Sequence, residues 1–242
     1  MKNLEYLFLL LALLGEILGT VGGFGSSVFF VPVANFYFDF QTVLGITALF
    51  HVASNLSKII MFKKGIDKKL ITYIGIPAVI FVIIGGIIAK YLDDYFLEII
   101  LGIFLIGLSL LFLIKKGIII KPNKREALLG GTLSGFFAGV LGTGGAIRGL
   151  TMAAFNLEKN AFIATSAIID FFVDFSRSIV YFFNGFITKE ILIYIPFLVL
   201  ISIVGTYIGK LLLKRISQEI FKKMSLYLIL IIGITTLLAA LV

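Results

Sequence analysis

Long apolar runs follow one another almost without interruption along this chain of 242 residues. A helix of about 20 apolar residues crosses the roughly 30 Å hydrocarbon core of a bilayer, and most of the runs are long enough to do so. Only 14% of the residues are charged and 60% are hydrophobic, which excludes a soluble globular domain. The sequence predicts an all-α polytopic membrane protein whose apolar segments cover approximately 4–21, 26–38, 42–62, 70–90, 95–114, 127–141, 145–157, 160–183, 188–213 and 221–242.

Several classes of chemistry are excluded by the residues that are missing. The chain has no cysteine and a single histidine, so we expect no disulfide, thiolate nucleophile, metal centre or other cofactor. It also lacks the GxxxxGK[ST] phosphate-binding loop, which excludes ATP-driven transport by this chain alone. Asp170 and Asp174 lie one turn apart on one segment, whereas a catalytic pair normally converges from separate elements. We therefore expect no enzyme.

The positive charges are concentrated between the apolar segments. The net charge of +8 would suggest nucleic acid in a soluble protein, but here it is a topology signal that places the basic loops in the cytoplasm, beside lipid headgroups. The apolar stretch after Lys2 has no cleavage site, so it is expected to be the first membrane segment. The three basic clusters are Lys63, Lys64, Lys68 and Lys69; Lys115, Lys116, Lys121, Lys124 and Arg125; and Lys210, Lys214, Arg215, Lys222 and Lys223.

The chain repeats itself at a spacing of 119 residues, which predicts two homologous membrane repeats, 1–120 and 121–242, in one integral domain. Repeats of this kind are common in secondary transporters. The first repeat carries its basic loop at 63–69 and the second carries it one connection later, at 210–223, which predicts inverted topology with both termini outside. The matched pairs include Gly23 with Gly142, Gly25 with Gly144, Ala48 with Ala167, Ser57 with Ser176, Lys58 with Arg177, and Pro77 with Pro196.

Each repeat begins with a glycine-broken segment. The runs at 26–38 and 145–157 are short, and they follow Gly22-Gly23-Phe24-Gly25 and Gly142-Thr143-Gly144-Gly145. Glycine breaks helices, and irregular backbone at membrane depth is tolerated only against protein or water. We expect either re-entrant segments or short spanning helices here, followed by three full transmembrane helices in each repeat. Close helix packing through small residues is the alternative explanation. Gly25, Ser26, Gly144 and Gly145 are candidate substrate contacts.

Two polar stripes occupy equivalent segments of the two repeats. Helical spacing puts each set of residues on one face of its segment, and both stripes end in a cation. Ionisable residues inside a membrane are costly and are functional candidates by default. The first stripe is Thr47, His51, Asn55 and Lys58, and the second is Ser166, Asp170, Asp174 and Arg177.

The buried charges suggest how an anion would be bound. Arg148 follows the second glycine cluster, where helix N-terminal N–H groups favour anions. The cations Lys58, Arg148 and Arg177 balance the carboxylates of Glu16, Asp170 and Asp174, so an arriving anion requires protonation of a carboxylate or of His51 for the site to stay neutral. We therefore assign Lys58, Arg177, Arg148, Asn55, Thr47 and Ser166 to substrate binding, and His51, Asp170, Asp174 and Glu16 to proton coupling.

Simpler roles exist for the same side chains. Lys58 and Arg177 lie near helix ends, where they can extend to the membrane interface, and Arg177 can simply be neutralised by a nearby carboxylate. His51 can be a packing histidine with satisfied hydrogen bonds.

The motifs of both repeats resemble those of the TauE/SafE family over nearly the whole chain. The resemblance rests on Gly23-Phe24-Gly25-Ser26-Ser27…Pro32, Gly45-Ile46-Thr47-Ala48 and Phe62…Gly65-Ile66-Asp67, and on Gly139-Val140-Leu141-Gly142-Thr143-Gly144-Gly145 and Ala164-Thr165-Ser166-Ala167. Ser26 and Ser27 stand where the family often has glycines, and Thr151 replaces the second proline.

The resemblance implies a transporter in the cell membrane that moves sulfite, a sulfonate or a related organosulfur anion, driven by an ion gradient. A proton is the suspected coupling ion, and a homo-oligomer is compatible with the sequence. The residues themselves do not choose sulfur over phosphate or carboxylate. The alternatives are an anion channel and a permease for another small oxyanion or carboxylate.

Overall fold

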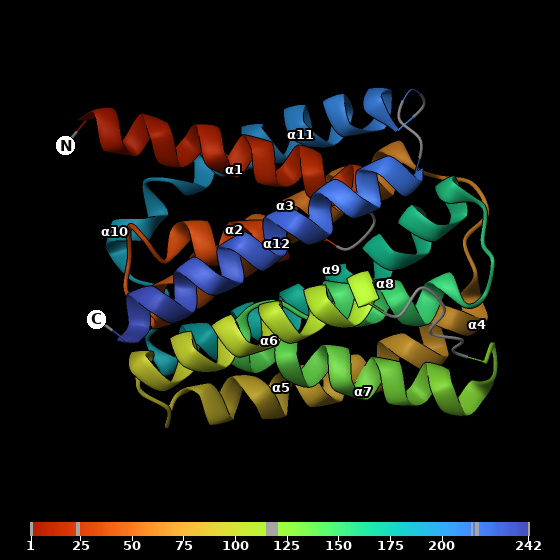
Figure 1. The fold of residues 1–242 in the computed structure, drawn as a ribbon, viewed down its shortest axis with the longest axis horizontal. Coiled ribbons are helices and arrows are strands. Elements are labelled where there is room, and N and C mark those ends of the chain that lie inside the picture. Colours follow the sequence, from red (N-terminus) through yellow and green to blue (C-terminus); the bar gives the residue numbers. More distant parts are fainter. Residues whose placement is uncertain (1, 23–24, 115–120, 214, 216–217, 242) are drawn as a thin grey trace.

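The computed structural model describes residues 2–22, 25–114, 121–213, 215 and 218–241, and these are helical with short connections and no strand (Figure 1). The predicted runs correspond to helices within a few residues. The elements are α1 (Lys2–Gly22), α2 (Ser27–Ala34), α3 (Phe40–Met61), α4 (Lys68–Leu70), the π-helical turn η1 (Ile71–Gly75), α5 (Ile76–Ala89), α6 (Asp94–Ile114), α7 (Lys124–Leu141), α8 (Gly145–Ala153), α9 (Lys159–Asn184), α10 (Lys189–Leu192), α11 (Ile195–Leu212) and α12 (Gln218–Leu241).

Four helical stretches in the described part of the chain are long and apolar enough to cross a membrane: Phe40–Met61, Lys68–Ala89, Asp94–Leu111 and Ile195–Leu212. Tyr6–Gly22 and Leu226–Leu241 are shorter apolar helices. Large apolar side chains are exposed along these helices, as expected for surfaces that face lipid. The chain is a multi-pass membrane protein.

The structure refines two predicted segments. The run at 188–213 is divided into α10 and α11 just before Pro196, and the equivalent run at 70–90 contains the π-helical turn just before Pro77. Proline has no N–H to donate and clashes with the preceding turn of a helix, so both matched prolines begin a new helix.

The glycine-broken segments each consist of a long helix followed by a half-length one. α1 has 21 residues and α2 has 8, while α7 has 18 residues and α8 has 9. Gly25 and Gly142 adopt φ angles of +82° and +71°, which other residues rarely tolerate. Gly22 ends α1, but Gly23 and Phe24 of the first glycine motif lie outside the described residues.

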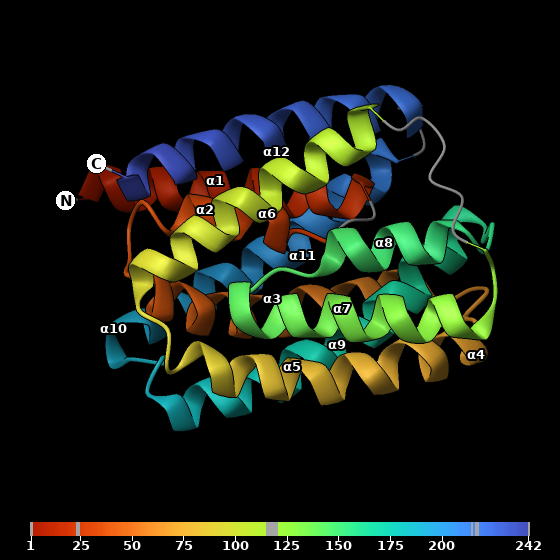
Figure 2. The same cartoon turned by 60° about the horizontal axis from the view of Figure 1, so that its bottom comes forward.

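Equivalent helices of the two halves run in opposite directions. In Figures 1 and 2, α1, α3 and α6 run away from the end that carries both chain termini, whereas α7, α9 and α12 run toward it. The packing partners exchange in the same way, because α1 packs on α11 and α7 on α5, while α3 packs on α9 and α6 on α12. We infer from the sequence spacing and this arrangement that 1–120 and 121–242 are inverted repeats.

The described basic residues of all three clusters lie at one end of the bundle, here called the basic end. Lys210 Nζ donates to the Met61 carbonyl over 2.7 Å, which joins the ends of α3 and α11. Lys124 lies over the Tyr73 ring, which brings the start of α7 to η1. The opposite end, here called the terminal end, carries both chain termini (Figure 2). Lys115, Lys116 and Lys214 lie outside the described residues, as do the side chains of Lys222 and Lys223.

Candidate functional site

The two polar stripes face each other at the centre of the bundle, because α3 packs directly on α9. Asn55 Nδ2 donates to Asp174 Oδ2 over 2.6 Å. These residues are 119 positions apart, so they are equivalent members of the two stripes. The site therefore lies between two helices, one from each half of the chain.

The N-termini of α2 and α8 meet at the same place. The Ser27 and Thr143 hydroxyls lie 3.2 Å apart, and the two half-helices run from there toward opposite ends of the bundle (Figure 2). The first N–H groups of a helix have no partner within the helix and carry the positive end of its dipole. Two such ends, from helices of 8 and 9 residues, offer backbone donors to an anion at the bundle centre.

Each predicted cation is paired with one of the predicted carboxylates. Lys58 Nζ lies 2.9 Å from Glu16 Oε1, and Arg177 Nε lies 2.8 Å from Asp174 Oδ1, although the Nε–H is not aimed at that oxygen. Arg148 Nη1 pairs with Asp170 Oδ1. Lys58 is only 5% exposed and Arg177 1%, which excludes extension of either side chain to the membrane interface. The predicted balance of charges therefore exists as three ion pairs, in which only Asp170 is half-buried and the other five residues are buried.

Glu16 is the most enclosed of the three carboxylates. Besides Lys58, its oxygens accept hydrogen bonds from four hydroxyl groups, those of Thr20, Ser26, Ser54 and Thr206 at 3.3, 2.7, 2.8 and 2.9 Å. α11 approaches α1 closely at this point, because a Cβ on Gly205 would meet the Glu16 side chain. Such a dense set of donors compensates for removing the carboxylate from water.

Lys58 and Arg148 keep hydrogen-bond donors for a ligand. The Lys58 ammonium has three N–H groups and uses two, toward Glu16 and toward Ser54 Oγ at 2.6 Å. Arg148 uses Nε toward Ser166 and Nη1 toward Asp170, while its Nη2 lies beside Gly25. Arg177 is more committed, because its Nη1 donates to the Ala138 and Gly142 carbonyls at the end of α7.

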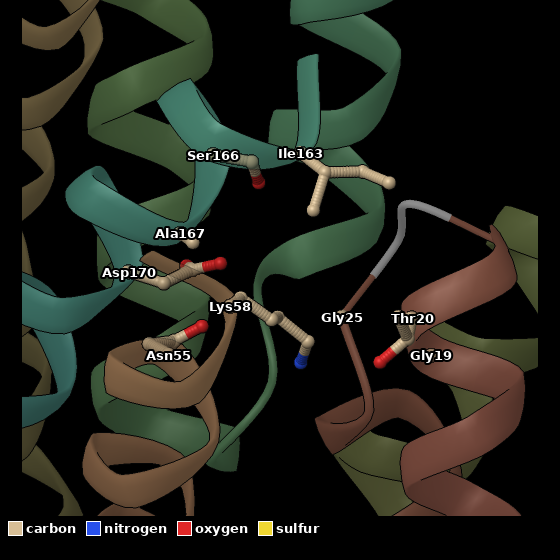
Figure 3. Close-up of a pocket in the computed structure, with 9 residues that line it drawn as sticks. All are labelled: Gly19, Thr20, Gly25, Asn55, Lys58, Ile163, Ser166, Ala167 and Asp170. Atoms are coloured by element: carbon tan, nitrogen blue, oxygen red, sulfur yellow. The ribbon is translucent and has the colours of Figure 1, made fainter. Parts of the chain in front are cut away.

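Two small adjoining cavities lie among these groups, each of about 20 Å³. That volume suffices for about one water molecule, so the site is closed around its ion pairs. In the first cavity, the Lys58 ammonium points from α3 toward Gly25 and Thr20, and Ser166 and Asp170 of α9 line the other side (Figure 3). We call the second the central cavity; its lining includes Gly25, Ser26, His51, Asn55, Lys58, Gly144, Gly145, Arg148, Asp170, Asp174 and Arg177.

Thr47 and Glu16 line neither cavity within the described part of the chain. Thr47 is fully buried, and its carbonyl accepts a hydrogen bond from His51 Nδ1 at 2.8 Å, so the structure brings it to the histidine rather than to the cavity. Glu16 contacts Lys58, Thr20 and Ser26, which line the cavities. Of the 14 predicted residues, the other 12 line one or both cavities.

Five polar residues of the site were missed in the sequence: Thr20, Ser27, Ser54, Thr143 and Thr206. Thr20 lines the first cavity and lies one turn after Glu16. Ser54 lies one turn before Lys58 on the first stripe, so the spacing of that stripe contained a signal for it. Ser27 and Thr143 follow or lie within the glycine motifs. Thr206 carries no local signal, because its role depends on α11 packing against Glu16, 190 residues earlier in the chain.

The model of the sulfite exporter TauE/SafE family matches residues 7–236, nearly the whole chain. The chain belongs to the TauE/SafE family. It is therefore an integral membrane transporter of the sulfite exporter class, as the motifs in both repeats predicted. No curated protein and no solved structure matches this TauE/SafE member.

Proposed function

We propose that this TauE/SafE protein is a secondary transporter that moves sulfite, or a related organosulfur anion, by alternating access at the central cavity. The observation that carries the proposal is the convergence of two half-helix N-termini on Lys58 and Arg148 at the repeat interface. Backbone N–H groups, an ammonium and a guanidinium together suit a small oxyanion with several acceptor oxygens.

An anion that binds here competes with Asp170 for Arg148. Asp170 has the most exposed side chain of the three carboxylates, at 14%, and it lines both cavities. When the anion takes its place on the guanidinium, Asp170 loses its counter-charge inside the membrane. Protonation of Asp170, or of another carboxylate of the site, then offsets one negative charge of the anion. This is the physical basis for coupling anion movement to protons.

Besides Asp170, the hydrogen-bonded side chains of Glu16, Ser26 and His51 provide a second site for the proton. His51 Nδ1 must carry hydrogen, because its partner, the Thr47 carbonyl, can only accept. His51 Nε2 and Glu16 Oε2 lie 2.8 and 2.7 Å from the single Ser26 hydroxyl. Two protonation states therefore satisfy both hydrogen bonds. In the first, His51 is an imidazolium that donates to Ser26, and Ser26 donates to the Glu16 carboxylate. In the second, Glu16 is a carboxylic acid that donates to Ser26, and Ser26 donates to the neutral His51 imidazole. One proton moves between Glu16 and His51 through Ser26.

An anion channel is the nearest alternative. The ion pairs and the apolar packing on both sides of the cavity favour alternating access instead, because a channel needs a continuous polar pore. A permease for phosphate or a carboxylate would use the same donors, so the choice of a sulfur anion rests on family membership.

Uptake of radiolabelled sulfite into proteoliposomes that contain the purified chain tests the proposal. We expect saturable uptake that an inward proton gradient accelerates, and competition by sulfonates. Flux that rises linearly with concentration would favour a channel, and complete competition by phosphate or acetate, without uptake of sulfite, would favour the other permease.

A further inference from the structure

A large cavity opens on the basic end of the bundle, outside the site described above. It has a volume of about 660 Å³. Its lining joins the end of α3, the start of α9 and the end of α11, and consists of Met61, Phe62, Lys63, Lys64, Lys159, Asn160, Lys210 and Leu213. We call it the lysine vestibule. Four of these lining residues are lysines and none is a carboxylate, so the electrostatic field of the vestibule attracts anions.

A thin apolar layer separates the lysine vestibule from the site. Phe62, Ile163 and Ala164 form a small buried cluster, with Met61, Phe162 and Leu213 packed against it. Phe62 and Leu213 line the vestibule, and Ile163 lines the cavity of Figure 3 beside Lys58 and Ser166. The layer between the two spaces therefore consists of Phe62 and Leu213 on the vestibule side and Ile163 on the cavity side.

Lys210 holds this layer in place. Its Nζ donates to the Met61 carbonyl and lies 5.2 Å from the centre of the Phe62 ring. The ammonium is attracted both to the carbonyl end of α3 and to the face of the ring. It thereby ties α11, which belongs to the second half, to the aromatic side chain at the end of α3.

The route toward the terminal end is closed by much more packing. His51 lies against the Phe30 and Phe50 rings, which belong to a large buried cluster that extends to Phe8 and to Leu198 of α11. The 119-residue spacing matches Phe62 with Tyr181, and Tyr181 lies in that large cluster, where its hydroxyl donates to the Gly139 carbonyl over 2.7 Å. Equivalent positions thus form a thin layer at one end and a thick one at the other.

We propose that the lysine vestibule collects the free oxyanion at the basic face, and that the Phe62–Ile163–Leu213 layer is the gate between the vestibule and the central cavity. This inference rests on the proposed transport function for its ligand. When the gate side chains move apart, an anion held by the lysines passes to Lys58 without crossing the thick apolar cluster. Lys210 is a positioning residue that favours the closed gate.

Cysteine labelling tests the gate without any substrate, so it remains readable if sulfite proves to be the wrong anion. The chain has no native cysteine, and Ala167 lines the cavity behind the gate. In Ala167→Cys, we expect the added changes Phe62→Ala and Lys210→Gln each to speed labelling from the basic face at least tenfold. Phe36→Ala, at an exposed aromatic near the terminal end, is the matched control and should leave the rate unchanged. Unchanged labelling in both gate variants, or faster labelling only from the opposite face, would overturn the gate.

The Ala167→Cys variant also tests whether the lysine vestibule attracts free anions. The ratio of labelling rates for an anionic and a cationic thiol reagent should fall at least fivefold when Lys63, Lys64 and Lys159 are replaced with glutamine, in vesicles of phosphatidylcholine alone. An unchanged ratio would overturn capture of free anions. A change seen only in vesicles that contain phosphatidylglycerol would also overturn it, because a lipid headgroup would then be the occupant.

Discussion

Replacing Arg148 with alanine is expected to lower sulfite flux at least 100-fold. Arg148 is the cation carried by half-helix α8 itself, and its Nη2 reaches toward Gly25 at the start of the opposing half-helix. Its loss removes the fork of donors that matches an oxyanion and leaves the Asp170 carboxylate without a counter-charge in the cavity. Both effects disfavour anion binding, so initial rates of radiolabelled sulfite uptake should show the loss at all substrate concentrations below saturation.

Asp170→Asn is the matched variant, and its effect on binding has the opposite sign. With the competing carboxylate gone, sulfite meets a free guanidinium, and we expect its apparent affinity to rise about tenfold at neutral pH and to depend less on pH. Arg125→Ala, at an exposed position near the start of α7, controls for general loss of positive charge. Normal flux in Arg148→Ala, or weaker binding in a well-folded Asp170→Asn, would contradict the competition between anion and carboxylate.

Glu16→Gln is expected to uncouple transport from the proton gradient. Glutamine keeps the size of the side chain and one acceptor oxygen, but its NH2 group donates where the second oxygen accepted, and it cannot hold the proton that Ser26 exchanges with His51. Lys58 and Arg148 keep their free donors. We therefore expect an inward proton gradient to give no acceleration of sulfite uptake, while exchange of internal for external sulfite stays within about threefold of the unmodified rate.

Sulfite exchange and proton-gradient-driven sulfite uptake, measured in the same proteoliposomes, show whether transport persists without proton coupling. Glu98→Gln serves as the control, because Glu98 is another membrane-segment carboxylate, which accepts a hydrogen bond from Asn35 directly after α2. It should retain both activities. If Glu16→Gln still accumulates sulfite in response to a proton gradient, the proton is carried elsewhere, and Asp170 and Asp174 become the remaining carriers.

The sequence contained most of the site because its signals are local. The glycine clusters predicted the two broken segments, and helical spacing brought Lys58, Asn55 and His51 onto one face of a single helix. Charge arithmetic predicted a balanced set of cations and carboxylates. These patterns follow from backbone geometry and from the cost of charge in a membrane, neither of which requires knowledge of the packing.

The partners of each charge were not predictable, because they depend on contacts between helices far apart in the sequence. Glu16 gathers its hydroxyl groups from α1, α3 and α11 and from the start of α2. Arg177 is bound to the end of α7, which no spacing within α9 indicates. The lysine vestibule brings together three helix ends from both halves of the chain. Such arrangements result from tertiary packing alone.

Locating a bound substrate analogue tests the central claim most directly. Selenite has the shape and charge of sulfite and carries a heavy atom, so a structure of the purified protein with selenite would reveal the position of the selenium. We predict selenium between the starts of α2 and α8, within contact of Lys58 and Arg148, and with Asp170 moved away from the guanidinium. Selenium bound only in the lysine vestibule, or at a site that includes neither Lys58 nor Arg148, would contradict an anion site between the two half-helices.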